Sequence, residues 1–176
     1  MSRVNLDNMA EKSGEWLKGE GPESDIVVSS RIRLARNLTD YPFISKATEL
    51  DREEIEKTLR NTVTDVSKQD LLDYLDVNEL DDIDRQFLVE RQLISREHAE
   101  SEGARGVAID AGERTSLMIN EEDHLRIQVM HSGFDLVAAW ERINEIDDRL
   151  EQRTAYAFHS RLGYLTACPT NVGTGM

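Results

Sequence analysis

Apolar side chains recur every three or four positions in three stretches of the chain, which predicts three amphipathic helices. The first covers residues 51–67, and Asp51 with Glu54 forms a start that resembles a capping box. The second covers residues 79–91, and the third covers residues 135–151 with acidic residues on its other side. We expect the core to receive Ile55, Leu59, Val63 and Val66 from the first helix, Leu80, Ile83 and Phe87 from the second, and Leu136, Trp140, Ile143, Ile146 and Leu150 from the third.

Short apolar runs between these helices predict strands. The runs cover residues 26–28, 106–110, 115–119, 125–131 and 164–166. Residues 111–114 are short enough to form the turn of an antiparallel hairpin. Neighbouring strands with tight turns and helices grouped between them indicate an α+β fold, in which an antiparallel β-sheet is flanked by helices.

The Gly-Pro pair at residues 21–22 is a break in the chain. We expect residues 1–25 to form a short head, in which Trp16 and Leu17 anchor one helical turn. Residues 26–176 are then expected to form one domain. This length is sufficient for a single core, and the 39% hydrophobic content is sufficient for folding.

The chain is strongly acidic, with a formal net charge of −14. This charge argues against nucleic acid as a main partner, because phosphate binding requires a basic face. No apolar run approaches the length of a membrane span, and the first twenty residues lack the apolar segment of a secretory signal. Cys168 is the only cysteine, so no internal disulfide forms within the chain, which fits a reducing cytoplasm.

Residues 120–126 combine acidic and basic side chains between two predicted strands. Glu121, Glu122 and Asp123 follow each other, and Arg126 comes four residues after Glu122. Charged groups beside a core must be paired or functional, so this string is a candidate site. A solvated acidic turn is the alternative interpretation. We interpret Glu121 and Asp123 as supporting residues and the neighbouring His124 as structural.

Arginine is preferred over lysine, with 16 Arg against 5 Lys, and two arginines alternate in residues 29–33. In an extended segment Arg31 and Arg33 lie on the same side of the strand. Planar guanidinium groups suit the oxygens of a nucleotide triphosphate, and we expect Arg126 to complete such a clamp. The alternative is that these arginines pair with surface acids, of which the chain offers many.

Three stretches taken together resemble the phosphagen (guanidino) kinase family. They are residues 29–33, residues 120–126, and residues 168–175, which read Cys-Pro-Thr-Asn-Val-Gly-Thr-Gly. They occur in the family's order and at similar spacing. Residues 21–37 and 161–166 are most similar to the bacterial protein-arginine kinases of this family. The resemblance covers about residues 14–176.

The resemblance implies the fold of a guanidino-kinase catalytic domain and the transfer of a phosphoryl group from ATP, with Mg²⁺, to a guanidinium nitrogen of arginine residues in proteins. It implies that Glu122 is the catalytic carboxylate, which holds the acceptor and accepts its proton. Cys168 is implied to be catalytic and to lie as a thiolate against the guanidinium. No residue is assigned to bind a metal. Nucleotide contacts are implied for Ser29, Ser30, Arg31, Ile32, Arg33, Gln92 and Arg126.

Partners and location follow from the same resemblance. It implies protein substrates with exposed arginine, a zinc-binding activator protein, the Clp protease system, a role in the stress response and a cytoplasmic location. The short head lacks the helical domain that precedes the catalytic domain in animal creatine and arginine kinases. An open site of this kind suits an arginine displayed on a protein.

The chain departs from the family pattern at two places. Gln92 stands where the family has a histidine that contacts the nucleotide. The family also continues beyond the position of Met176 with further nucleotide-binding arginines, so we expect this chain to correspond to the N-terminal half of such a kinase, truncated within the catalytic domain, and to be inactive by itself. The alternatives are a kinase for a small free guanidino compound and a catalytically inactive fragment or pseudokinase that acts as a binding module.

Overall fold

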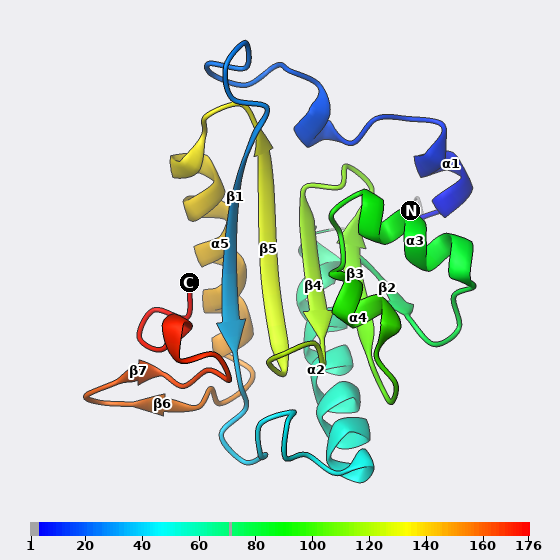
Figure 1. The fold of residues 1–176 in the computed structure, drawn as a ribbon. Coiled ribbons are helices and arrows are strands. Elements are labelled where there is room, and N and C mark those ends of the chain that lie inside the picture. The colour runs from blue at the N-terminus through cyan, green and yellow to red at the C-terminus, as the bar shows by residue number, and fades with distance from the viewer. Residues whose placement is uncertain (1–3, 71) are drawn as a thin grey trace.

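The computed structural model describes residues 4–70 and 72–176, and an antiparallel sheet forms its centre (Figure 1). The five strands of this sheet lie in the order β1-β5-β4-β3-β2. Their bounds are Ser29–Arg36 for β1, Leu72–Asp76 for β2, Gly106–Asp110 for β3, Thr115–Ile119 for β4 and Leu125–Ser132 for β5. A separate small hairpin pairs β6 (Phe158–His159) with β7 (Gly163–Tyr164). The antiparallel sheet flanked by helices confirms the predicted α+β fold.

Helices cover both faces of the sheet. The two long helices, α2 and α5, pack on one face, and the short helices α3 and α4 lie on the other side near β2 and β3 (Figure 1). The N-terminal segment crosses the end of the sheet above α3 (Figure 1). The helix bounds are Leu6–Ala10 for α1, Glu49–Asp70 for α2, Asp82–Glu90 for α3, Arg96–Glu100 for α4 and Leu136–Glu151 for α5, with 3₁₀ turns at Glu15–Leu17 and Pro169–Asn171. None of the helices described combines the length and apolar character needed to cross a membrane.

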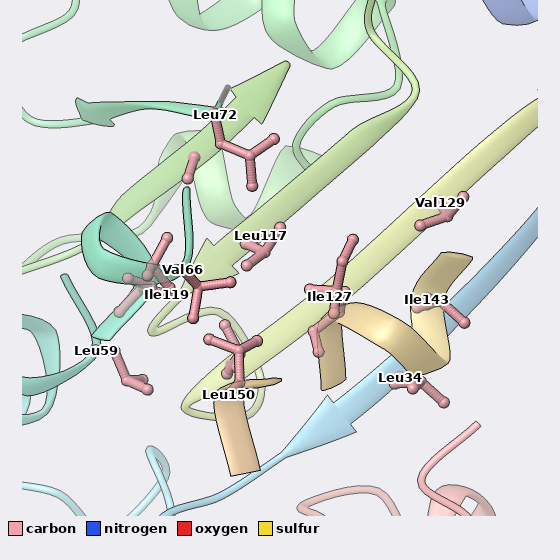
Figure 2. Packing of buried hydrophobic residues seen from close by; sticks show 14 of the residues in the cluster. Leu34, Leu59, Val66, Leu72, Leu117, Ile119, Ile127, Val129, Ile143 and Leu150 are labelled. Atoms are coloured by element: carbon pink, nitrogen blue, oxygen red, sulfur yellow. The ribbon is translucent and has the colours of Figure 1, made fainter. Parts of the chain in front are cut away.

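Strand alternation directs side chains of β3 and β4 into two separate apolar clusters, whereas β5 contributes to the larger one. Leu117 and Ile127 lie in the larger cluster with residues of α2 and α5 (Figure 2). Val107 and Ile109 of β3 and Met118 of β4 face the other way, into a cluster with α1 and α3. The second cluster covers β2, β3 and β4, whereas Arg31 and Arg33 on the edge strand β1 stay exposed on that side. The sheet is therefore apolar on one face and divided between apolar cover and arginine on the other.

Most predicted elements are present, but several predicted core positions are wrong. Residues 26–28 do not form a strand, because the backbone N–H groups of Ile26 and Val27 both donate to the carbonyl of Glu23 and close a turn. Ile26 is 78% exposed, and β1 begins only at Ser29. Ile83 is equally exposed, and Leu88 is the buried residue of α3.

Helix α5 packs with a different side than predicted in its first turns. Leu136 and Trp140 are exposed, and Ala139 is buried. The small Ala139 side chain allows the helix to approach β1 and β5 closely. Strand β2 and helix α4 are absent from the sequence-based prediction. The predicted strand at residues 164–166 is limited to the two-residue β7.

His98 of α4 is fully buried. Its ring Nε2 lies 3.2 Å from the carbonyl oxygen of Gly106, to which the neutral imidazole donates. Burial lowers the pKa of His98 to about 4. The unfolded chain has a histidine pKa of about 6.5, so protons bind the unfolded state preferentially as the pH falls from about 6.5 to about 4.

We predict that replacing His98 with glutamine removes a pH-dependent loss of stability. In the parent chain, stability contributed by neutral His98 is fully present above pH 6.5 and decreases by roughly 3 kcal/mol as the pH falls to about 4. Urea denaturation of both proteins at several pH values measures this difference. His159→Gln is the matched control, because His159 is exposed. An unchanged pH dependence in His98→Gln would show that His98 is not held neutral.

Candidate functional site

Three arginines gather where β1 meets β5 on the less covered face of the sheet. Arg31 and Arg33 alternate along β1, as predicted, and both are exposed. The register pairs Arg33 with Gln128 and Ala35 with Arg126, so all three arginines point to the same side. Partial burial, together with the positive charges of Arg31 and Arg126, lowers the pKa of Arg33. Their mutual repulsion makes this surface suited to a polyanion.

Arg31 and Arg33 form no ion pair with the described side chains. No carboxylate of residues 4–66 and 72–176 lies within 4.0 Å of either guanidinium group. The chain has 35 acidic residues against 21 basic ones, so unpaired arginines are not forced by its composition. The interpretation that the arginines of this motif merely pair with surface acids therefore does not hold for these two.

The remaining residues of the first motif are divided between the two sides of β1. Ser29 shares the side of the arginines, whereas Ile32 packs against the main apolar cluster. Ser30 is buried, and its hydroxyl donates to the carbonyl of Gly133 at 2.8 Å. The side chains of Ser30 and Ile32 therefore point away from the surface formed by Arg31, Arg33 and Arg126, which we call the arginine surface.

The acidic string forms a tight loop between β4 and β5. Asn120 has a positive φ of 59°, and its N–H donates to the carbonyl of His124 at 2.9 Å. The side chain of Glu121 is buried, with 5% of it exposed, and its Oε2 lies 2.7 Å from Nη1 of Arg126. Glu122 is 48% exposed, and its Oε2 lies 3.8 Å from Nη2 of Arg126. The two neighbouring glutamates thus differ: Glu121 supports Arg126, and Glu122 is available to a ligand.

Asp123 connects this loop to the segment that contains Cys168. Its Oδ1 accepts hydrogen bonds from Nδ2 of Asn37 at 2.5 Å and from the backbone N–H of Ala167 at 2.7 Å. Asn37 also accepts a bond from the N–H of His124 at 2.9 Å. These buried bonds set Glu122 and Cys168 relative to each other, since each is next in sequence to a bonded residue.

His124 is a structural part of the same network. Its Nδ1 accepts from the N–H of Leu38 at 2.9 Å, and its Nε2 lies 2.9 Å from the carbonyl oxygen of Pro42. This pattern requires a neutral ring that carries its proton on Nε2. Burial lowers the pKa of His124 and favours this neutral form.

The segment of residues 168–176 lies beside the edge strand β1 (Figure 1). Its Gly175 carbonyl accepts from the N–H of Ala35 at 2.7 Å. Gly175 has a φ of 73°, and a Cβ atom there would lie 2.2 Å from Nη1 of Arg36. Cys168 is half-buried, and its Sγ lies 2.9 Å from Oγ1 of Thr170. A small cavity of about 60 Å³ lies between this segment and the arginines and is lined by Arg33, Ala35, Arg126, Asn171, Gly175 and Met176.

Arg36 holds the segment of residues 168–176 against β1 and α5. It forms an ion pair of 2.5 Å with Asp147 of α5, and both side chains are buried. Its Nη1 donates to the carbonyl of Thr174 at 3.0 Å, and its guanidinium lies 3.8 Å from the ring centroid of Tyr164. Arg36 is thus a structural residue, whereas Arg31 and Arg33 are free to contact a ligand.

Gln92 lies beside the arginine surface. Its Oε1 accepts from Nη1 of Arg31 at 3.3 Å. Its backbone carbonyl accepts from Nε2 of Gln128 at 2.6 Å. The structure therefore places Gln92 next to the first of the predicted arginines.

Sequence reasoning missed Ser95, Asn37 and Asp147 as parts of the site. Ser95 donates to Glu121 at 2.7 Å, and Asn37 and Asp147 form the contacts described above. One signal was available for Asp147. It lies four residues after Ile143 and one after Ile146 within the apolar stripe of the helix, where an acid indicates a buried partner. For Ser95 and Asn37 no local pattern exists, because their partners are distant in sequence.

Comparisons with known proteins show the family to which the chain is similar. The family model for the ATP:guanido phosphotransferase C-terminal catalytic domain matches residues 54–176. The chain is 44% identical over 174 residues to the protein-arginine kinase of Halothermothrix orenii, covering 98% of this chain and 50% of that protein. It is 48% identical over 164 residues to the protein-arginine kinase of Symbiobacterium thermophilum, covering 92% of this chain and 46% of that protein.

A solved structure has the same fold. The substrate-free duplicated taurocyamine kinase from Schistosoma mansoni superposes with a TM-score of 0.80 at 27% sequence identity, covering 99% of this chain and 26% of that chain. The chain spans about half the length of the two bacterial relatives.

We predict that Asp123→Ala loosens the Cys168 segment and destabilises the protein. The Asn37 amide and the Ala167 N–H lose their shared acceptor, at a cost of about 2–4 kcal/mol in the free energy of unfolding. Urea denaturation measures the stability, and hydrogen exchange at the Ala167 amide measures the loosening. Asp148→Ala is the control, since Asp148 is exposed on α5 and its loss should change stability by less than about 0.5 kcal/mol. Full protection of the Ala167 amide in Asp123→Ala would contradict the prediction.

Proposed function

This chain belongs to the ATP:guanido phosphotransferase family, and we propose that the protein that carries it transfers the γ-phosphoryl group of ATP to arginine residues of proteins. The proposal rests on Arg31 and Arg33, which form no ion pair with the described carboxylates and lie beside Arg126 and the exposed carboxylate of Glu122. A cationic surface next to one available carboxylate suits both a nucleotide triphosphate and a guanidinium acceptor. The names of the bacterial relatives supply the protein substrate.

The arginines would act on the phosphate groups. Arg31 and Arg33 stand on a strand whose backbone is fixed by pairing with β5, and Nη1 of Arg31 also donates to Gln92 at 3.3 Å, so both arginines start from fixed positions on the sheet before the nucleotide binds. Donors fixed in this way stabilise charge on the γ-phosphoryl oxygens without further reorganisation. In this proposal Mg²⁺ enters with ATP as part of the substrate, and Gln92 contacts the nucleotide beside Arg31.

Glu122 would act on the acceptor. An arginine guanidinium is always protonated near neutral pH and is a poor nucleophile until a proton is removed. A carboxylate can hold two of its N–H groups and accept that proton while the new N–P bond forms and the bond between the γ-phosphorus and the β,γ-bridging oxygen breaks, releasing ADP. The 48% exposure of Glu122 leaves room for such an acceptor. Cys168, held through Ala167 and Asp123, would contact the same guanidinium.

Several parts of the interpretation stay predictions from the resemblance. They are the zinc-binding activator protein, the Clp protease system, the role in the stress response and the cytoplasmic location. Transfer to a small free guanidino compound is the competing activity. The two activities differ in the acceptor only, so one assay with both acceptors separates them.

We predict that Glu122→Gln lowers kcat by about 10²–10⁴-fold, because an amide cannot accept the proton of the acceptor. The assay uses the purified protein that carries this chain, ATP with Mg²⁺, and either a folded arginine-containing protein or free arginine. Mass spectrometry and ³¹P NMR detect phosphoarginine. The dissociation constant for ATP should change little, since Glu122 does not contact the phosphates in this proposal.

Glu141→Gln is the matched control, because Glu141 is exposed on α5 away from the arginines. It should leave kcat unchanged. Full activity in Glu122→Gln would exclude Glu122 as the proton acceptor. Phosphorylation of free arginine but of no protein would replace the proposed acceptor with a small guanidino compound.

A further inference from the structure

The hydroxyl group of Ser95 has two hydrogen bonds of different kinds. Ser95 is the N-cap of α4, and its Oγ accepts from the backbone N–H of His98 at 3.0 Å. The same Oγ donates to Oε1 of Glu121 at 2.7 Å. Accepting the first bond is ordinary capping, which aspartate or asparagine would do as well. Only a side chain that also carries a proton can make the second bond.

Glu121, which accepts the hydrogen bond of Ser95, also binds two residues of the site. Both of its carboxylate oxygens accept from Nη1 of Arg126, at 2.9 Å and 2.7 Å. Its Oε2 also accepts from the backbone N–H of Glu122 at 3.1 Å. Glu121 therefore fixes the direction of the Arg126 guanidinium and the start of the backbone that carries Glu122.

The burial of Glu121 and Arg126 increases the contribution of their hydrogen bonds to the orientation of Arg126. Only 5% of its side chain and 15% of the Arg126 side chain are exposed, so water does not compensate for a lost bond on this side. The second ion pair of Arg126, with Glu122, is longer at 3.8 Å, and Glu122 is half-exposed. The Glu121 contact is therefore the one that can hold Arg126 in a single orientation.

We propose that Ser95 is a positioning residue for phosphoryl transfer, which acts through Glu121 to aim Arg126 and Glu122 at the reacting groups. The inference rests on the proposed function of the arginine surface. It assigns to Ser95, the N-cap of the short helix α4, a role in catalysis that is separate from capping. The two roles of Ser95 can be separated because different side chains preserve one or both of them.

The test compares Ser95→Asp with Ser95→Thr. Aspartate keeps the cap but cannot donate to Glu121 and adds a negative charge beside it. Threonine keeps both the acceptor and the donor. We expect Ser95→Asp to raise the KM for ATP and to lower kcat by about tenfold or more each, with a Tm within a few degrees of the parent protein. Ser95→Thr should restore both constants to near the parent values.

A double variant tests whether the effect passes through Arg126. If it does, adding Ser95→Asp to Arg126→Ala changes the KM for ATP no further, because the side chain to be aimed is already absent. Independent effects that multiply in the double variant would overturn the proposal. Ser95→Gly, which also caps a helix but has no donor, should reproduce the kinetic defect if Ser95→Asp fails to fold.

The outcomes distinguish the inference from the function on which it rests. If Arg126→Ala weakens ATP binding, measured by calorimetry with ATP and Mg²⁺, but Ser95→Asp and Ser95→Gly retain the parent kinetic constants, only the role of Ser95 is wrong. If Arg126→Ala binds ATP as the parent protein does, the arginine surface is not the nucleotide site, and both proposals fail.

Discussion

The buried ion pair between Arg36 and Asp147 is the contact on which the rest of the site depends. Both side chains are almost inaccessible, and the guanidinium also bonds the carbonyl of Thr174 and stacks on Tyr164. Four separate parts of the chain therefore meet at one charge: β1, α5, β7 and the segment after Cys168. Removing one partner of such a pair is far more costly than the pair's net contribution to stability, because the other charge stays buried. The ion pair is thus chiefly a device that specifies where the C-terminal segment lies on the edge of the sheet.

The two faces of the sheet have different roles: one face packs into the main apolar cluster, and the other carries the arginines of the candidate site. Ile127 packs into the main cluster with α2 and α5, while its neighbour Arg126 points to the opposite face. The same alternation along β1 places Leu34 in the core and Arg33 in the site. A ligand-binding residue on such a strand has a fixed backbone position, because the core residues beside it are tightly packed. This arrangement suits a reaction whose catalysis is mainly positioning and electrostatic stabilisation. The loop residues Glu122 and Cys168 lack this direct support, so they depend on the buried bonds of Asp123 and Asn37.

The sequence was informative where a pattern is local and uninformative where the partner is distant. Period-two spacing correctly placed Arg31 and Arg33 on one side of a strand, and β3, β4 and β5 were found from their apolar runs. The pattern failed for Ile26 and Ile83, because hydrophobic residues in turns and first helical turns resemble core residues until the packing is known. Strand β2, which reads Leu-Asp-Tyr-Leu-Asp, was missed because two acids interrupt its apolar residues, although its pairing with β3 overrides that composition. The roles of Asn37 and Ser95 arise only from contacts across 86 and 26 positions of sequence separation.

The distribution of acidic residues around the candidate site differs from what the overall charge of the chain suggests. The chain has 35 acidic residues against 21 basic ones, so its composition supplies enough carboxylates to pair with its arginines. Instead two acidic side chains near the site are buried against arginines: Glu121 against Arg126 and Asp147 against Arg36. Arg31 and Arg33 form no ion pair of this kind with the side chains that the structure describes, and both are exposed to solvent. An acidic exterior repels other polyanions at long range, while the local arginine cluster attracts one that fits. The charge distribution thereby favours a compact anion such as a nucleotide triphosphate over an extended nucleic acid, which would have to lie across the acidic surface as well.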